Sequence, residues 1–105
     1  MTKFRVVYSR ASLHDMRKIR TYIAERSSIR IARRYVARLK SFCADLSFAP
    51  YRGEPRPGLK SSLRSIGFEN RISVAFNISE SERIVRIVSF HYAGRAWNES
   101  AAHQT

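Results

Sequence analysis

The sequence is short of the features that mark several large classes of protein. It has one cysteine, Cys43, so no internal disulfide can form, as expected for a chain in a reducing compartment. No apolar run approaches the ~20 residues of a membrane-spanning helix, and the first residues lack the apolar core of a signal peptide. The spacings typical of metal, nucleotide and catalytic-triad sites are also missing. We therefore expect a cytoplasmic protein with no membrane partner, no cofactor and no metal.

Acidic residues are scarce. Eight Asp and Glu face twenty Lys and Arg, which gives a formal net charge of +12, and sixteen of the twenty cations are Arg. Residues 1–60 hold 15 basic and 4 acidic residues, whereas residues 61–105 hold 5 and 4. Such an excess predicts attraction to nucleic acid, a ribosome or an acidic protein. Arginine binds phosphate and carboxylate in a bidentate manner. Because most of the basic residues lie in the first half of the chain, we expect this half to bind an anionic partner.

The length of 105 residues fits one domain, 1–105, with a flexible tail from about 99 to 105. Residues 3–8 alternate like a short strand. Apolar residues then recur at three- and four-residue spacing over 13–25 and again over 29–48, which predicts two amphipathic helices. Their expected buried stripes are Leu13, Met16, Ile19, Ile23, and Ile31, Ala32, Tyr35, Val36, Leu39, Phe42, Cys43, Leu46.

Serines mark the starts of the two helices. Ser9 or Ser12 can cap the first, and Ser12 with Asp15 fits a capping box; Ser27 and Ser28 separate the helices and can cap the second. Because this break is so short, the helices should be antiparallel neighbours. Residues 49–60 hold all three prolines and two of the four glycines, which predicts a connector.

Strands are expected over residues 62–66, 71–78 and 83–91, with the last two joined by a turn at 79–82. Pairing Ile78 with Arg83 gives a coherent apolar face. The same register places His91 on the core face and Arg71 opposite Phe90 on the other. The predicted fold class is therefore α+β: an N-terminal strand and an antiparallel helical hairpin, then three antiparallel strands forming one sheet.

In this order the chain resembles the RelE/ParE superfamily of toxins from type II toxin–antitoxin pairs, and the ParE branch most closely. The resemblance spans about residues 4–98 and rests on order and spacing. The residues that carry it are Asp15, Ile19, Tyr22-Ile23-Ala24-Glu25, Ala32, Arg33, Arg34, Tyr35, Leu39, Pro50, Gly53, Arg56, Leu63-Arg64-Ser65, Arg71-Ile72, Val85-Arg86-Ile87-Val88-Ser89-Phe90-His91 and Gly94-Arg95-Ala96-Trp97.

The resemblance implies a toxin held inactive by a cognate ParD-like antitoxin and linked to plasmid stabilisation. ParE-like members are associated with inhibition of DNA gyrase, and this activity needs no catalytic residue. The C-terminal portion is implicated in target binding, which here points to His91, Tyr92, Arg95 and Trp97. Antitoxins are typically acidic and fold on binding, so we expect Arg30, Arg33, Arg34 and Arg38 to contribute to antitoxin capture.

The alternative is a RelE-like nuclease that cleaves mRNA on the ribosome, with Arg71, His91 and Arg95 as its catalytic residues. Two features weaken it: the paired lysines of the earlier strand are replaced by Arg64 alone, and no tyrosine follows Arg95. A second alternative is a basic nucleic-acid-binding module, but no recognition-helix motif is present. If the chain is a toxin, we expect it to contact DNA only indirectly, through the antitoxin complex.

Overall fold

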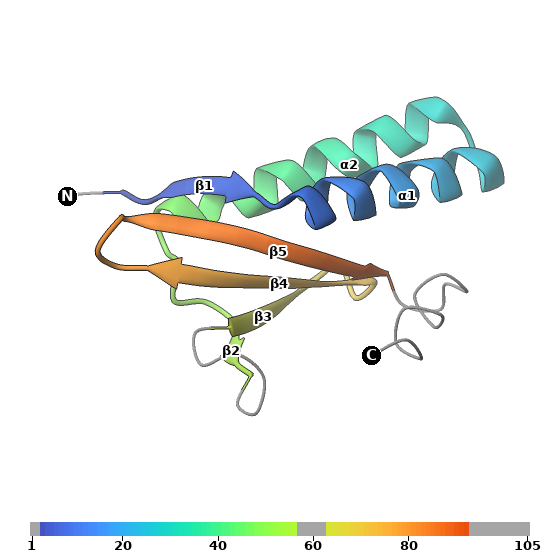
Figure 1. Cartoon of the computed structure of the whole chain (residues 1–105). Coiled ribbons are helices and arrows are strands. Elements are labelled where there is room, and N and C mark those ends of the chain that lie inside the picture. Colours follow the sequence, from blue (N-terminus) through green and yellow to red (C-terminus); the bar gives the residue numbers. More distant parts are fainter. Residues whose placement is uncertain (1–2, 57–62, 93–105) are drawn as a thin grey trace.

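The computed structural model describes residues 3–56 and 63–92 of the chain. Two helices cover one face of a five-stranded sheet with the strand order β1-β5-β4-β3-β2 (Figure 1). The elements are β1 (Arg5–Tyr8), α1 (Arg10–Arg26), α2 (Ile29–Ala44), a 3-10 turn (Asp45–Ser47), β2 (Glu54–Pro55), β3 (Leu63–Phe68), β4 (Ile72–Ser79) and β5 (Ile84–Tyr92). This confirms the predicted α+β class and its hairpin. The expected tail at 99–105 lies outside the described residues.

Serine side chains set both helix starts. Ser9 caps α1 by accepting the Ser12 N–H at 3.0 Å, and Ser28 caps α2 by accepting the Ile31 N–H at 3.1 Å. Both caps have the extended backbone that this role requires. Ser12 is buried inside the first turn and donates its hydroxyl to the Ser9 carbonyl oxygen. The capping box expected from Ser12 and Asp15 is therefore wrong.

The sheet is larger than the sequence predicted. β1 pairs with β5 in parallel, so the sheet is mixed. The short strand β2 forms inside the proline-containing connector and pairs with β3. Its proline suits an edge position, because an edge strand has one row of backbone groups without a sheet partner.

One apolar core lies between the helices and the sheet. Its members are Phe4, Met16, Ile19, Tyr35, Val36, Leu39, Cys43, Leu46, Phe68, Ile72, Val74, Phe76, Val85, Ile87, Phe90 and Tyr92. Cys43 is fully buried, as a small apolar side chain would be, and burial raises the pKa of its thiol to about 12. Two residues of the predicted stripes are exposed, Leu13 to 41% and Ile31 to 48%, while Ile23 and Phe42 are partly buried against the core.

The predicted pairing of Ile78 with Arg83 is wrong, because Ile78 pairs with Val85, and an irregularity in β5 shifts the register again further along the strands. Phe76 lies opposite Ile87, but its neighbour Ala75 lies opposite Ser89, so Val88 has no direct partner. Such a bulge reverses the side-chain alternation beyond it. His91 is therefore exposed and pairs with Ser73, whereas Phe90 is buried opposite Val74. The predictions of an inward His91 and of Phe90 opposite Arg71 are both wrong.

The start of α1 supports this bulge. The Ser9 hydroxyl donates to the Val88 carbonyl oxygen at 2.8 Å, and the Phe90 N–H donates to Asp15 Oδ2 at 3.0 Å. Because β1 ends at Tyr8, this edge of β5 has no strand partner beyond Ile87. Side chains from α1 thus satisfy backbone groups that would otherwise be unpaired.

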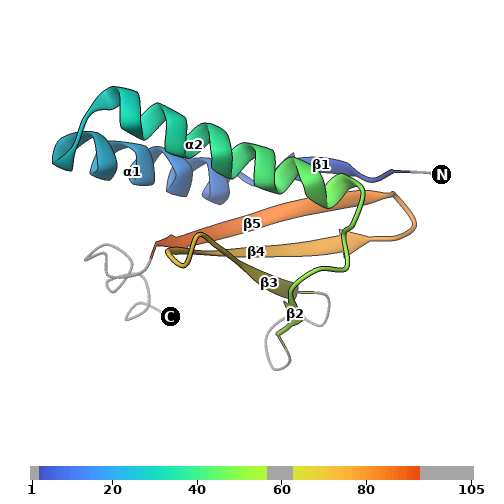
Figure 2. The same cartoon turned by 180° about the vertical axis from the view of Figure 1, so that it is seen from behind.

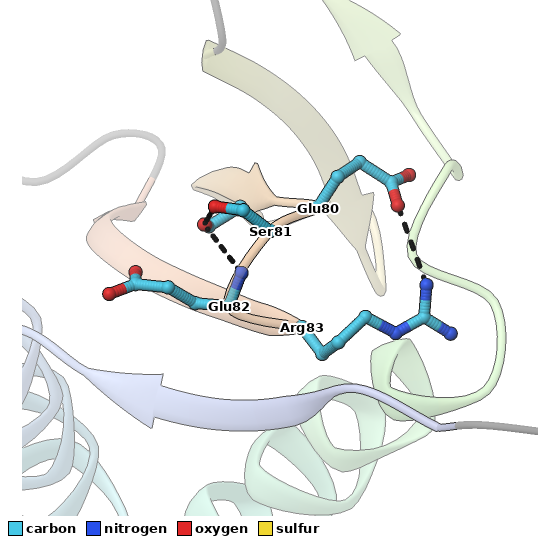
Figure 3. Close-up of polar contacts among 5 residues, drawn as sticks. Glu80, Ser81, Glu82 and Arg83 are labelled. Atoms are coloured by element: carbon cyan, nitrogen blue, oxygen red, sulfur yellow. Dashed lines mark hydrogen bonds and ion pairs between the residues drawn. The ribbon is translucent and has the colours of Figure 1, made fainter.

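The turn between β4 and β5 carries Glu80 and Arg83, whose side chains point toward each other (Figure 3). Arg83 has a positive φ of 57°, which any side chain other than glycine adopts at a cost. Its guanidinium reaches Glu80 Oε1 at 3.4 Å and lies 4.4 Å from the centre of the Phe4 ring. The predicted turn at 79–82 is confirmed, with Arg83 covering the edge of the core.

Candidate functional site

The outward side of the helical hairpin carries a groove between α1 and α2. Two hollows that share Arg20 make up this interhelical groove. One, of about 230 Å³, is lined by Leu13, Met16, Arg17, Arg20, Val36 and Lys40. The other, of about 400 Å³, is lined by Arg20, Thr21, Ala24, Glu25, Ile29 and Arg33. The groove therefore runs along much of the hairpin.

The chemistry of the groove is apolar in the middle and mainly basic at the rim. Leu13 and Ile29 are 41% and 52% exposed in it. Four cations contribute to its lining, against one carboxylate, that of Glu25. This combination fits an amphipathic segment that has an apolar stripe and acidic flanks. Arg17, Arg20 and Lys40 were missed in the sequence, where their four-residue spacing from Leu13, Met16 and Val36, respectively, could have indicated a common groove.

The four arginines predicted to bind an antitoxin do not form one cluster. All are exposed on α2. Arg33 lines the interhelical groove, while the helical spacing of Arg30 and Arg34 places them on the outward surface. Arg38 lies on the opposite flank, where its Nε and Nη2 atoms donate to the Glu69 carboxylate at 2.8 and 3.0 Å.

Arg38 is thus already bound to a carboxylate. These hydrogen bonds lower the pKa of the Glu69 carboxyl. Burial raises the pKa of the nearby Tyr35 hydroxyl to about 12, and the charge of Glu69 adds to this, whereas Arg71 and Arg38 oppose it. Arg71 therefore acts electrostatically at this flank of α2, beside Tyr35 and Glu69.

Of the three residues of the nuclease alternative, the structure describes Arg71 and His91, which lie at the same end of the β4–β5 pair. His91 lies on the helix-free face of the sheet, where its Nε2 is 3.2 Å from the Ser89 hydroxyl. Within the described ranges, no contact joins His91 to Arg71. Arg95 lies outside the described residues, as does Trp97 from the predicted target surface. Tyr92 is only 5% exposed and belongs to the core, which leaves little of its ring to meet a target.

Arg64 has a structural task that the sequence did not reveal. Its Nε donates to the Arg52 carbonyl oxygen at 3.1 Å, and its Nη2 lies 3.4 and 3.3 Å from those of Tyr51 and Gly53. The guanidinium thus binds three successive carbonyl groups of the connector. Gly53 has a φ of 71°, and a Cβ atom there would collide with the Ser65 carbonyl oxygen. Only glycine fits this close approach.

Solved structures with the same fold are toxins and toxin–antitoxin complexes. The chromosomal ParDE system of P. aeruginosa matches with a TM-score of 0.73 and 15% identity, over 86% of this chain and 96% of that one. The RelBE2 complex of Mycobacterium tuberculosis matches with a TM-score of 0.71 and 18% identity, over 90% and 97%. A double mutant of the E. coli toxin RelE in the free state matches with a TM-score of 0.61 and 13% identity, over 99% and 97%. Among curated proteins, no match is found.

These structures define the fold as that of the RelE/ParE class of small toxins. Residues 6–97 also match the family model of the ParE toxin of the type II toxin–antitoxin system parDE. The chain belongs to this ParE toxin family. Neither of its helices, within the described residues, is long and apolar enough to cross a membrane.

Proposed function

We propose that this chain is a toxin that inhibits DNA gyrase in the cytoplasm and that a cognate ParD-like antitoxin neutralises it. Membership of the ParE family supplies the class of target. The observation that favours gyrase over mRNA cleavage is the position of the chain's sheet-borne cations. Arg64 binds carbonyl groups of the connector, and Arg71 acts beside Tyr35 and Glu69.

Cleavage of RNA needs a base, an acid and cations gathered around one phosphate. Among the described candidates, His91 has Ser89 as its hydrogen-bonding neighbour and the charge of Arg71 acts on Tyr35 and Glu69, although both candidates lie at the same end of the β4–β5 pair. Inhibition by docking on gyrase has no such geometric requirement. The use of Arg64 to bind connector carbonyl groups, with Arg71 acting on Tyr35 and Glu69, supports the binding mechanism, and His91 is an exposed residue that is available to contact the target.

The experiment is to assay the purified chain in parallel for inhibition of gyrase supercoiling and for mRNA cleavage on translating ribosomes. We expect inhibition of supercoiling and no cleavage. The variant His91→Ala should weaken inhibition only if His91 touches gyrase, while a substitution at Arg71 should leave it unchanged. Cleavage that is lost in His91→Ala and Arg71→Ala, without gyrase inhibition, would replace this proposal with the nuclease.

Antitoxin capture is assigned to the interhelical groove together with Arg30, Arg33 and Arg34. The groove offers exposed apolar side chains for the stripe of a folding helix, and the arginines offer cations for its acidic flanks. Arg38 contributes only if the antitoxin displaces Glu69 from it. The order of importance that we expect within the predicted set therefore begins with Arg33 and ends with Arg38.

Charge reversal tests this assignment. Replacing Arg30, Arg33, Arg34 and Arg38 by Glu should reduce affinity for the co-encoded antitoxin by about 100-fold or more at low salt and flatten the salt dependence. A control with half the change in net charge reverses Arg5 and Arg86, which are exposed on β1 and β5, and should be compared with the pair Arg30 and Arg33 reversed alone. If the four reversals leave affinity and salt dependence unchanged, the hairpin is not the antitoxin surface.

A further inference from the structure

Two exposed aromatic rings lie on the segment that follows α2, away from the interhelical groove. Phe48 is 73% exposed and Tyr51 is 55% exposed, the two highest values among the large hydrophobic side chains that the structure describes. Figure 2 shows this segment running from the end of α2 toward β2, at the opposite end of the hairpin from the α1–α2 loop. We call residues 48–53 the connector segment, since they include the start of the connector predicted at residues 49–60. An exposed pair of rings on one short segment indicates a binding surface.

The connector segment is held in place although it has no regular structure. Arg64 donates to carbonyl oxygens within it, and Pro50 is buried. At its start, the Phe48 N–H donates to the Asp45 carbonyl oxygen at 3.1 Å. At its end, Gly53 packs directly against β3. The two rings are therefore carried by an ordered backbone, so that little conformational entropy is lost when they bind a ligand.

Cations accompany the rings. Lys3 Nζ is 5.5 Å from the centre of the Phe48 ring, and the Arg64 guanidinium is 5.7 Å from the centre of the Tyr51 ring. Arg52, within the segment, stacks over the half-buried Phe42 at 5.9 Å. Arg56 follows the segment in the sequence. Together with Lys3, Arg52 and Arg64 it makes four cations, compared with two carboxylates, those of Asp45 and Glu54. The rings thus stand in a locally positive environment.

We propose that the connector segment is a binding site for single-stranded nucleic acid, in which Phe48 and Tyr51 stack on bases and Lys3, Arg52 and Arg56 contact phosphates. Stacking platforms flanked by cations are the usual means of binding single strands without reading their sequence. The high exposure of both rings favours bases as their partners, because an exposed aromatic ring offers apolar area on which a planar base can stack. None of these five residues lines the interhelical groove or belongs to the set predicted to bind the target.

The test separates stacking from charge. Fluorescence anisotropy measures binding of the purified chain to a labelled twelve-residue oligothymidylate and to an abasic strand of the same length. We expect the oligothymidylate to bind roughly tenfold or more tightly than the abasic strand. The double variant Phe48→Ala/Tyr51→Ala should lose this preference and keep its salt dependence. Arg52→Ala/Arg56→Ala should keep the preference and reduce the salt slope by about 1.4.

A control removes an exposed apolar side chain of the hairpin that lies outside the interhelical groove, Ile31→Ala, and should bind both strands like the unaltered chain. Tyr51→Phe, which keeps the ring, should also retain the preference. Equal binding of the two strands would overturn the proposal, since charge alone would then explain it. It would equally fail if Phe48→Ala/Tyr51→Ala left the preference intact, which would return these rings to contact with a protein partner.

Discussion

Arginines on the hairpin and arginines on the sheet have different tasks in this molecule. Arg17, Arg20 and Arg33 line the interhelical groove and make no hydrogen bond or ion pair within the described residues. Arg64 binds three carbonyl oxygens, and Arg83 covers Phe4 and pairs with Glu80. The same residue type thus provides charge for a partner in one region and holds irregular backbone in the other.

The comparison shows that net charge alone overstates how much of a basic protein is available to its partners. A guanidinium bound to main-chain carbonyl groups keeps its charge, but its donors and its geometry are already used. Three available cations of this chain, Arg17, Arg20 and Arg33, lie together along the interhelical groove. The groove is therefore the surface where we expect an acidic partner, whereas Arg64 and Arg83 should affect stability.

The largest expected effect comes from the glycine that lets the connector approach β3. Gly53→Ala should lower the free energy of unfolding by about 3 kcal/mol or more, because the new Cβ collides with the Ser65 carbonyl oxygen and φ is positive. Urea denaturation measures this. Gly67→Ala is the matched control, since nothing lies within 4 Å of the added Cβ. Equal stability of the two variants would show that the connector is not packed as described.

The next effect compares one arginine from each region. Arg64→Ala should cost about 1–3 kcal/mol of stability, because it leaves carbonyl groups of the connector without their donor. Arg33→Ala should change stability by no more than about 0.5 kcal/mol, as expected for an exposed side chain without partners, but should weaken antitoxin binding. If Arg33→Ala proved the more destabilising in urea, the division between the two regions would be wrong.

Periodicity was sufficient to predict the helices, the turn at 79–82 and the hairpin, because these depend on neighbours three to four residues apart or on a short turn. It did not show which side of each apolar stripe remains exposed to solvent. Leu13 and Ile31 are apolar, as core residues are, but both are exposed. Whether such a side chain is buried or exposed depends on where the other helix and the sheet lie, which is a tertiary property.

The surroundings of His91, a predicted target-binding residue, were harder to predict, because the contacts that fix this part of β5 join residues distant in sequence. The Phe90 N–H meets Asp15, 75 residues away, and the bulge beside it reverses the direction of His91. Val85, Ile87, Val88, Phe90 and Tyr92 are all apolar, so the sequence is compatible with a strand that either keeps or changes its phase. Only the hydrogen bonds from α1 decide between these registers.

A smaller effect on stability should follow from loss of the hydrogen bond between the Phe90 N–H and Asp15. Asp15→Ala leaves the Phe90 N–H without its acceptor, and we expect a cost of about 1–2 kcal/mol. Asp15→Asn keeps an oxygen acceptor and should retain most of the stability. Asp45→Ala, which removes an exposed carboxylate, controls for the change in net charge. In NMR spectra, the amide resonances of residues 88–91 should shift in Asp15→Ala and stay in place in Asp45→Ala.

The smallest effect concerns Arg38, the hairpin arginine that is bound like those of the sheet. Hydrogen bonds from Arg38 lower the pKa of Glu69 below its ordinary value of 4.5. The folded state therefore gains stability from this carboxylate above that pH, and loses the gain as the pH falls through the lowered pKa. Because both side chains are more than a third exposed, water and salt weaken the pair.

Glu69→Gln should thus be slightly less stable than the unaltered chain at pH 6 and low salt, and equal to it near pH 2. Thermal melts at the two pH values measure the difference, and high salt at pH 6 should reduce it. A difference that is the same at both pH values would mean that Glu69 acts through the shape of its turn, where its φ is also positive at 51°, and not through its charge.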